Sequence, residues 1–88
     1  MITFDDKLQQ QVVATNVRFE NNNLVIILSD GRELVVPLGK YDWLQWLAHA
    51  TPEQRAHWSL EPNGFAIYWD ELDDGIEIEH VLSLYALS

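Results

Sequence analysis

The stretch NLVIILSDGRELVVPL (residues 23–38) decides the fold, because two β-branched runs flank one turn signal. A two-residue turn at Asp30-Gly31 would mix apolar and polar side chains on each face of the hairpin. A three-residue loop with Gly31 in the left-handed region collects the apolar side chains on one face, so we favour it. The predicted core face then holds Leu24, Ile26, Leu28, Leu34, Val36 and Leu38.

The run VVATNVRF (residues 12–19) reads as a third strand before this hairpin. Asparagines tolerate the left-handed region, so a tight turn at Asn21-Asn22 can join the two runs. That turn adds Val13, Val17 and Phe19 to the core face. The N-terminal part is therefore predicted to be a three-stranded antiparallel meander, preceded by a weakly ordered lead-in over residues 1–11.

The opposite face of the meander keeps three apolar residues, Val25, Ile27 and Val35. A fully solvated sheet face is rarely so apolar. Either a later segment of the same chain covers these residues or a second chain does, and we favour the first. The second option makes the three residues a self-association surface and the protein a homodimer.

Downstream, YDWLQWLAHA (residues 41–50) has the apolar spacing of a helix, and TPEQ (51–54) is a capping box that starts a second short helix to about residue 57. Residues 58–60 and 65–69 predict a second β-hairpin around the PNG turn, with Phe65, Ile67 and Trp69 on one side. A short extended piece (76–78) and a short C-terminal helix follow. The expected fold is α+β, with residues 1–88 as one domain around one core.

Charge is unevenly distributed in this chain of 88 residues, whose formal net charge is −9. Residues 1–55 hold seven acids and five bases, a net of −2, whereas residues 56–88 hold seven acids and no Lys or Arg, a net of −7. Such a half repels nucleic acid and attracts a basic protein. There is no cysteine, no signal-peptide pattern and no apolar run of about 20 residues, so we expect a cytoplasmic protein without membrane contact.

Six carboxylates crowd the segment GFAIYWDELDDGIEIEH (residues 64–80), which raises the question of a metal site. An EF-hand loop that starts at Asp70 lacks two defining ligands, because its third and twelfth positions are Leu72 and Val81. A looser divalent site from Asp70, Asp73 and Asp74 stays open. The three histidines, His49, His57 and His80, form no zinc pattern.

Catalysis is not expected either. Glu71 and Asp73 are the best acid–base candidates, since they follow Trp69, but the sequence offers no activated nucleophile and no phosphate-binding loop. We therefore expect no enzymatic activity and no cofactor.

The remaining interpretation is a docking surface in which carboxylates steer a basic partner and an aromatic ring adds contact area. Its residues would be Tyr68, Asp70, Glu71, Asp73, Asp74, Glu77 and Glu79. The alternatives are a merely solvated acidic turn, a self-associating structural domain, and a metal- or small-ligand-binding domain.

Three segments, SDGRELVVPL, LAHATPEQRAHW and GFAIYWDELDDGIEIEHVL, resemble in the same order a family of small, mostly bacterial domains of unknown function. The shared pattern is Asp-Gly-Arg, Val-Pro-Leu, Ala-Thr-Pro-Glu-x-Arg and Gly-x-x-Ile-x-Trp-x-x-Leu-Asp, over roughly residues 12–84. The chain departs from it at Asp42-Trp43, where the family commonly has Pro-Arg, and at Gly75, where it has another acid.

This resemblance implies an α+β fold with an antiparallel sheet, and no known activity. Members of the family are often encoded beside another small protein, in pairs that look like toxin–antitoxin modules. By that association, the chain would be the acidic, antitoxin-like half that masks a basic partner encoded nearby.

Overall fold

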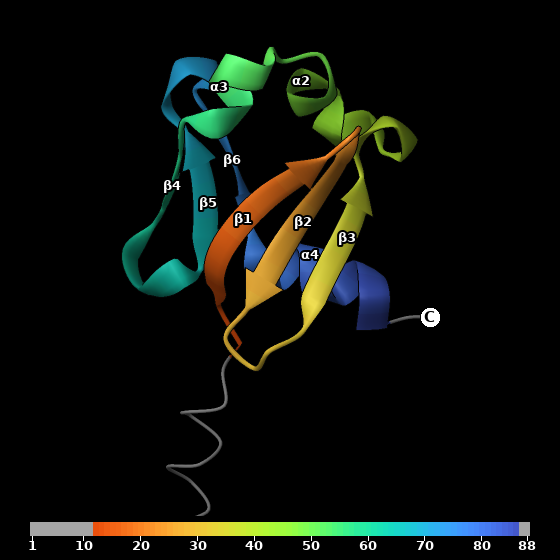
Figure 1. Ribbon diagram of the computed structural model, residues 1–88. Coiled ribbons are helices and arrows are strands. Elements are labelled where there is room, and N and C mark those ends of the chain that lie inside the picture. The colour runs from red at the N-terminus through yellow and green to blue at the C-terminus, as the bar shows by residue number, and fades with distance from the viewer. Residues whose placement is uncertain (1–11, 87–88) are drawn as a thin grey trace, which may run out of the picture.

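The N-terminal meander is present in the computed structural model, which describes residues 12–86, with side chains from 12 to 84. Strands β1 (Ala14–Glu20), β2 (Asn23–Leu28) and β3 (Glu33–Pro37) pair antiparallel in the order β1-β2-β3. Figure 1 shows them as one twisted sheet. The predicted lead-in over residues 1–11 lies outside the described residues.

The register of the β2–β3 hairpin is the predicted one. Leu24 pairs with Val36 and Ile26 pairs with Leu34, so the apolar side chains share one face. The amide of Leu28 donates to the carbonyl of Arg32 at 2.8 Å and closes a three-residue loop, in which Gly31 has a φ of 93°. That positive φ favours glycine and explains its place in the loop.

The β1–β2 turn is also as predicted, but the start of β1 is not. Val17 pairs with Ile26 and Phe19 with Leu24, which confirms them on the core face. Val13 was expected there too, and this is wrong, because the register shifts between Ala14 and Asn16. The extra residue of this bulge inverts the alternation, so Ala14, only 3% exposed, takes the core position.

The predicted helix over residues 41–50 is broken into shorter pieces. Two 3-10 turns, η1 (Leu38–Lys40) and η2 (Asp42–Leu44), precede α2 (Gln45–Ala48). Tyr41 interrupts the helical path with an extended backbone (φ −114°, ψ 128°). The side-chain Nε2 of Gln45 donates to the carbonyls of Tyr41 and Leu38, at 3.0 and 3.4 Å, and holds this irregular connection together.

The second helix, α3 (Pro52–Ala56), begins where the sequence predicts it. Thr51 Oγ1 accepts a bond from the Gln54 amide at 3.1 Å, and Gln54 Oε1 accepts one from the Thr51 amide at 3.0 Å. This reciprocal capping box satisfies donors that a helix start leaves free.

A second antiparallel sheet follows, in which the extended piece predicted over residues 76–78 is a third strand that begins and ends earlier, at Asp74 and Glu77. Strands β4 (Trp58–Leu60), β5 (Ala66–Trp69) and β6 (Asp74–Glu77) pair in chain order, joined by the 3-10 turns η3 (Pro62–Gly64) and η4 (Asp70–Leu72). The helix α4 (Ile78–Ala86) ends the described chain. Phe65 was expected to lie inward beside Ile67, which is wrong: its backbone is helical (φ −76°, ψ −18°) and it is 42% exposed.

One core joins the two sheets, which stand beside each other in Figure 1 with α4 crossing behind the meander. Trp69 of β5 is fully buried in this core. Its ring makes edge contacts with Trp46 and Phe19, at centroid distances of 5.7 and 6.3 Å, and its Nε1 donates to the Arg55 carbonyl at 3.0 Å. These contacts confirm an α+β fold around one core.

An ion pair crosses the outer face of the meander. Arg18 of β1 makes two hydrogen bonds with Glu33 of β3, at 3.0 and 3.2 Å, so its side chain crosses the outer face of β2. Beneath it Val25 is 0% exposed and Ile27 is half-buried, while Val35 at the edge is 49% exposed. Arg18 is the cross-strand partner of Val25, and Val35 is the most exposed of the three residues of the predicted self-association surface.

Candidate functional site

The acidic segment forms the turn between β5 and β6. The 3-10 turn Asp70–Leu72 is followed by Asp73 in the left-handed region (φ 52°), which reverses the chain. Trp69 then pairs with Asp74 and Tyr68 with Gly75. The carboxylates therefore sit on a reversal whose first strand is anchored by the buried Trp69.

Tyr68 bonds to a carboxylate of this turn. Its Oη donates to Asp73 Oδ1 at 2.5 Å. Because the bond requires the phenol proton, it raises the pKa of Tyr68 to about 12. The predicted contact tyrosine is thus held in its neutral form by one of the predicted acids, and the bond fixes its ring against the turn.

Glu71 makes a second polar contact, with the end of α3. Its Oε2 lies 2.5 Å from His57 Nδ1, and both side chains are exposed. This pair ties the turn to the segment between α3 and β4. Solvent reaches both groups, so an interaction of this kind contributes about 0–1 kcal/mol.

The predicted docking residues divide into two groups. Tyr68, Asp70, Glu71, Asp73 and Asp74 gather at the turn, which we call the acidic turn. Glu77 and Glu79 follow at the other end of β6, where Glu77 pairs with Ala66. Asp74 and Glu77 are three steps apart along β6, a span of about 10 Å. The sequence suggests one continuous surface, whereas the structure spreads it along the hairpin.

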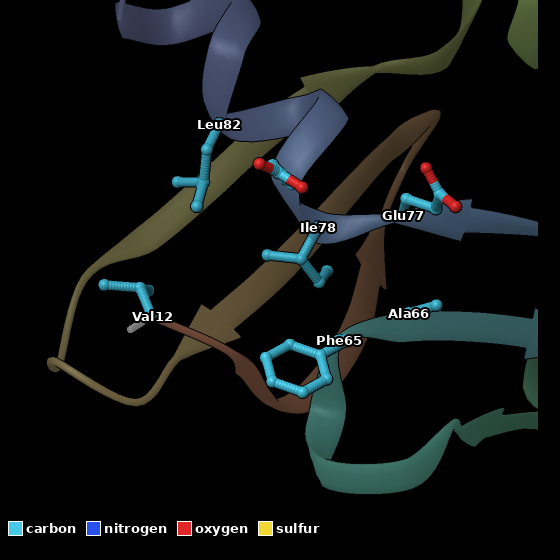
Figure 2. A pocket seen from close by; sticks show the side chains of 7 residues that line it. Val12, Phe65, Ala66, Glu77, Ile78 and Leu82 are labelled. Atoms are coloured by element: carbon cyan, nitrogen blue, oxygen red, sulfur yellow. The ribbon is translucent and has the colours of Figure 1, made fainter. Parts of the chain in front are cut away.

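A cavity of about 440 Å³ lies beside Glu77 and Glu79, where no sequence motif predicts one. Its apolar lining consists of Val12, Phe65, Ala66, Ile78 and Leu82. Figure 2 shows Val12, Phe65 and Leu82 around the opening. We call it the β5–α4 pocket. The one sequence signal for it is the PNG turn before Phe65, since a helical backbone after that turn releases Phe65 from the strand alternation.

Metal binding finds no support within residues 12–86, where no three His, Asp or Glu side chains come together as a ligand set. Asp73 and Asp74 are instead committed to bonds with Tyr68 and with the amide of Gly75. No helix in this range is long and apolar enough to cross a membrane.

Within residues 12–84, Arg55 of α3 donates more side-chain hydrogen bonds than any other residue, and its contacts are internal. Its guanidinium is half-buried and donates four hydrogen bonds that join α2 to the β1–β2 turn, and it lies 5.4 Å from the centre of the Phe19 ring. The acceptors are the carbonyls of Leu47 (3.2 Å), Ala48 (2.8 Å) and Asn21 (3.4 Å) and the side chain of Asn22 (2.8 Å). The Ala-Thr-Pro-Glu-x-Arg motif thus holds the fold together.

Comparisons with solved structures show the same fold in two bacterial proteins. A protein of unknown function from Rhodospirillum rubrum has a TM-score of 0.70 and 17% identity, over 84% of this chain and 88% of its own. An uncharacterised protein from Chromobacterium violaceum has a TM-score of 0.70 and 22% identity, over 90% of this chain and 72% of its own. At these identities the likeness concerns the fold alone. None of the curated proteins matches the chain.

A comparison with protein families assigns the chain to one of them. Residues 14–85 match the family described as "Protein of unknown function (DUF2442)". The match begins with β1 and ends inside α4, so it spans both sheets. The chain therefore belongs to the DUF2442 family.

Proposed function

We propose that this protein is an antitoxin-like binding module whose acidic C-terminal half masks a basic partner protein. The observation that carries the proposal is the charge distribution: residues 56–88 hold seven acids and no Lys or Arg. All seven acids are exposed, and they follow one another from Glu61 to Glu79 around the second sheet. A surface of one sign steers an oppositely charged protein and raises its association rate.

The acidic turn is the centre of the proposed surface. Tyr68 is half-buried and fixed by Asp73, so it offers a ring that loses little freedom on binding. Asp70 and Asp74 are exposed beside it. In this arrangement the carboxylates orient the basic partner and make its affinity depend on salt concentration, and the tyrosine ring contributes contact area.

The test begins with capture from a lysate of the native host by the tagged chain, followed by purification of the captured protein. We expect a basic protein. A variant with Asp70→Ser, Glu71→Ser and Asp74→Ser removes three charges and leaves the left-handed Asp73 in place. At about 0.5 kcal/mol for each exposed ion pair, it should bind about ten-fold more weakly, with a shallower salt dependence.

The matched control carries Glu20→Ser, Asp42→Ser and Glu53→Ser, which are exposed and lie outside the acidic half. It changes the net charge by the same amount, and we expect it to bind as the wild type does. If both variants bound the partner equally weakly, the loss of affinity would be due to net charge and not to the position of the acidic turn. Equal binding by the wild type and the acidic-turn variant would remove the turn from the mechanism.

Self-association is the second candidate function, favoured by the exposure of Val35 at 49% on the outer face of the meander. With Val25 fully buried, such a contact would rest on Val35 and the half-buried Ile27. The molar mass in solution, measured by sedimentation or light scattering across micromolar concentrations, shows whether the chain self-associates. We expect a dimer that Val35→Lys dissociates if this function is correct, and a monomer throughout if it is not.

A further inference from the structure

We infer that the β5–α4 pocket receives one apolar side chain of the basic partner, with an adjacent Lys or Arg of the same segment bound by Glu77 and Glu79. This inference rests on the proposed function and adds to it a second contact, the chemistry of the segment and the place where it binds.

The pocket has the composition of an anchor site for a single side chain. Ile78, only 1% exposed, lies in the core, and Phe65, 42% exposed, stands at the opening. Val12 and Leu82 are half-buried beside them. The volume of about 440 Å³ is within the range of ligand-binding clefts and far exceeds what one leucine or phenylalanine needs. Burial of such a side chain typically yields about 1.5–3 kcal/mol.

The charge of Glu77 and Glu79 determines which residue of the partner can lie next to the apolar side chain. Glu77 and Glu79 are both exposed at the pocket, and neither side chain makes a hydrogen bond or ion pair with another residue in the part of the chain that the structure describes. Residues 56–88 contain no Lys or Arg, so no cation of the acidic half can neutralise them. An apolar group next to a cation complements this site, whereas an acidic or phosphorylated segment would be repelled.

The pocket is also continuous with the proposed binding surface. Ala66 lines the pocket and begins β5, and Asp70 follows the last residue of the same strand. Ala66 and Asp70 are therefore about 13 Å apart along one hairpin. A partner segment of about four extended residues is long enough to reach from the anchor to the acidic turn.

The test uses the full chain and three amidated pentapeptides, followed by amide chemical shifts in solution NMR. The peptide Gly-Leu-Lys-Lys-Gly carries both features. Gly-Ser-Lys-Lys-Gly lacks the anchor, and Gly-Leu-Ser-Ser-Gly lacks the charge. We expect the first to shift the amides of Ala66 and Leu82 saturably and to bind about ten-fold more tightly than the serine-anchored peptide.

The double variant Glu77→Gln, Glu79→Gln keeps shape and removes charge from exposed positions, so it should remain folded. We expect it to bind the Leu-Lys-Lys peptide about five-fold more weakly and the Leu-Ser-Ser peptide unchanged. Ala66→Leu, which occupies part of the pocket and keeps both carboxylates, should reduce the preference for leucine over serine.

Three results would overturn the inference. One is the absence of saturable shifts at the pocket with the Leu-Lys-Lys peptide. Another is a set of nuclear Overhauser contacts between residues 1–11 and Phe65 in the peptide-free chain, which would make the chain's own segment the occupant. The third is equal binding of the captured partner by wild type and by the Glu77→Gln, Glu79→Gln variant. If in that third case the acidic-turn variant still binds the partner more weakly than the wild type, the inference about the pocket is wrong and the proposed function stands.

Discussion

Replacing Arg55 with alanine tests whether one side chain holds the two halves of the fold together. The change removes four hydrogen bonds that link α2 and the β1–β2 turn, together with the guanidinium beside the Phe19 ring. The backbone carbonyl of Arg55, which accepts the Trp69 indole, remains in place. The variant therefore separates the side-chain contacts from the packing of the core.

The magnitude follows from the geometry of those contacts. The two bonds at 2.8 Å are well formed, while those at 3.2 and 3.4 Å are longer and contribute less. A hydrogen bond to a charged group contributes about 1.5–3 kcal/mol, but these share one guanidinium, and water replaces part of each. We expect a loss of about 2–4 kcal/mol in the free energy of unfolding. For a domain of this size that lowers Tm by about 10–25 °C.

Urea unfolding followed by tryptophan fluorescence measures the loss, with Arg32→Ala as the matched control. Arg32 is exposed, and within residues 12–86 its side chain pairs only with Asp30, two residues away, so its removal should cost under about 0.5 kcal/mol. Arg55→Lys keeps the charge near Phe19 and one donor, and should recover less than half of the loss. A loss for Arg55→Ala as small as that for Arg32→Ala would refute the assigned role.

The remaining predictions concern the second sheet. Gly64→Ala should cost more than about 2 kcal/mol in urea unfolding, because φ is +75° and the new Cβ would lie 2.3 Å from a backbone oxygen of β1; a neutral result would mean that the turn can move away. Trp69→Phe should cost about 2 kcal/mol, since the Arg55 carbonyl loses its donor and the ring leaves a gap, and thermal melting would show it. The raised pKa of Tyr68 stabilises the folded state fully below pH of about 10, and this contribution is lost as pH rises through about 12. Asp73→Asn should return the tyrosinate absorbance transition of Tyr68 toward about 10, with Tyr68→Phe identifying the signal.

The meander was predictable because the apolar pattern of its strands and the residues of its turns favour the same strand register. Only one hairpin register puts Leu24, Ile26 and Val36 on a common face, and Gly31 supplies the backbone that this register needs. The bulge at the start of β1 was not predictable. Thr15, the extra residue, is an ordinary strand former, and only the fit of the tertiary structure makes it unpaired.

The connection and the candidate site show where local patterns stop being informative. The apolar spacing in residues 41–50 fits one continuous helix. The structure has instead the 3-10 turn η2 and the four-residue helix α2, which place Trp43, Leu44 and Leu47 against the core. The β5–α4 pocket joins residues 12, 65 and 82, which no local window contains. The acidic segment was visible as composition, but its division into two groups depends on the length of β6.

The bridge between Arg18 and Glu33 has a consequence for aggregation. Strand β2, NLVIIL, has no charge and no proline, a composition that stacks readily into cross-β assemblies when exposed. In the folded chain it is paired on both edges, and the bridge places charge across its solvent side. An exposed ion pair adds little to stability, so its larger effect is that of a gatekeeper, which keeps the most aggregation-prone segment from pairing with another copy during brief openings.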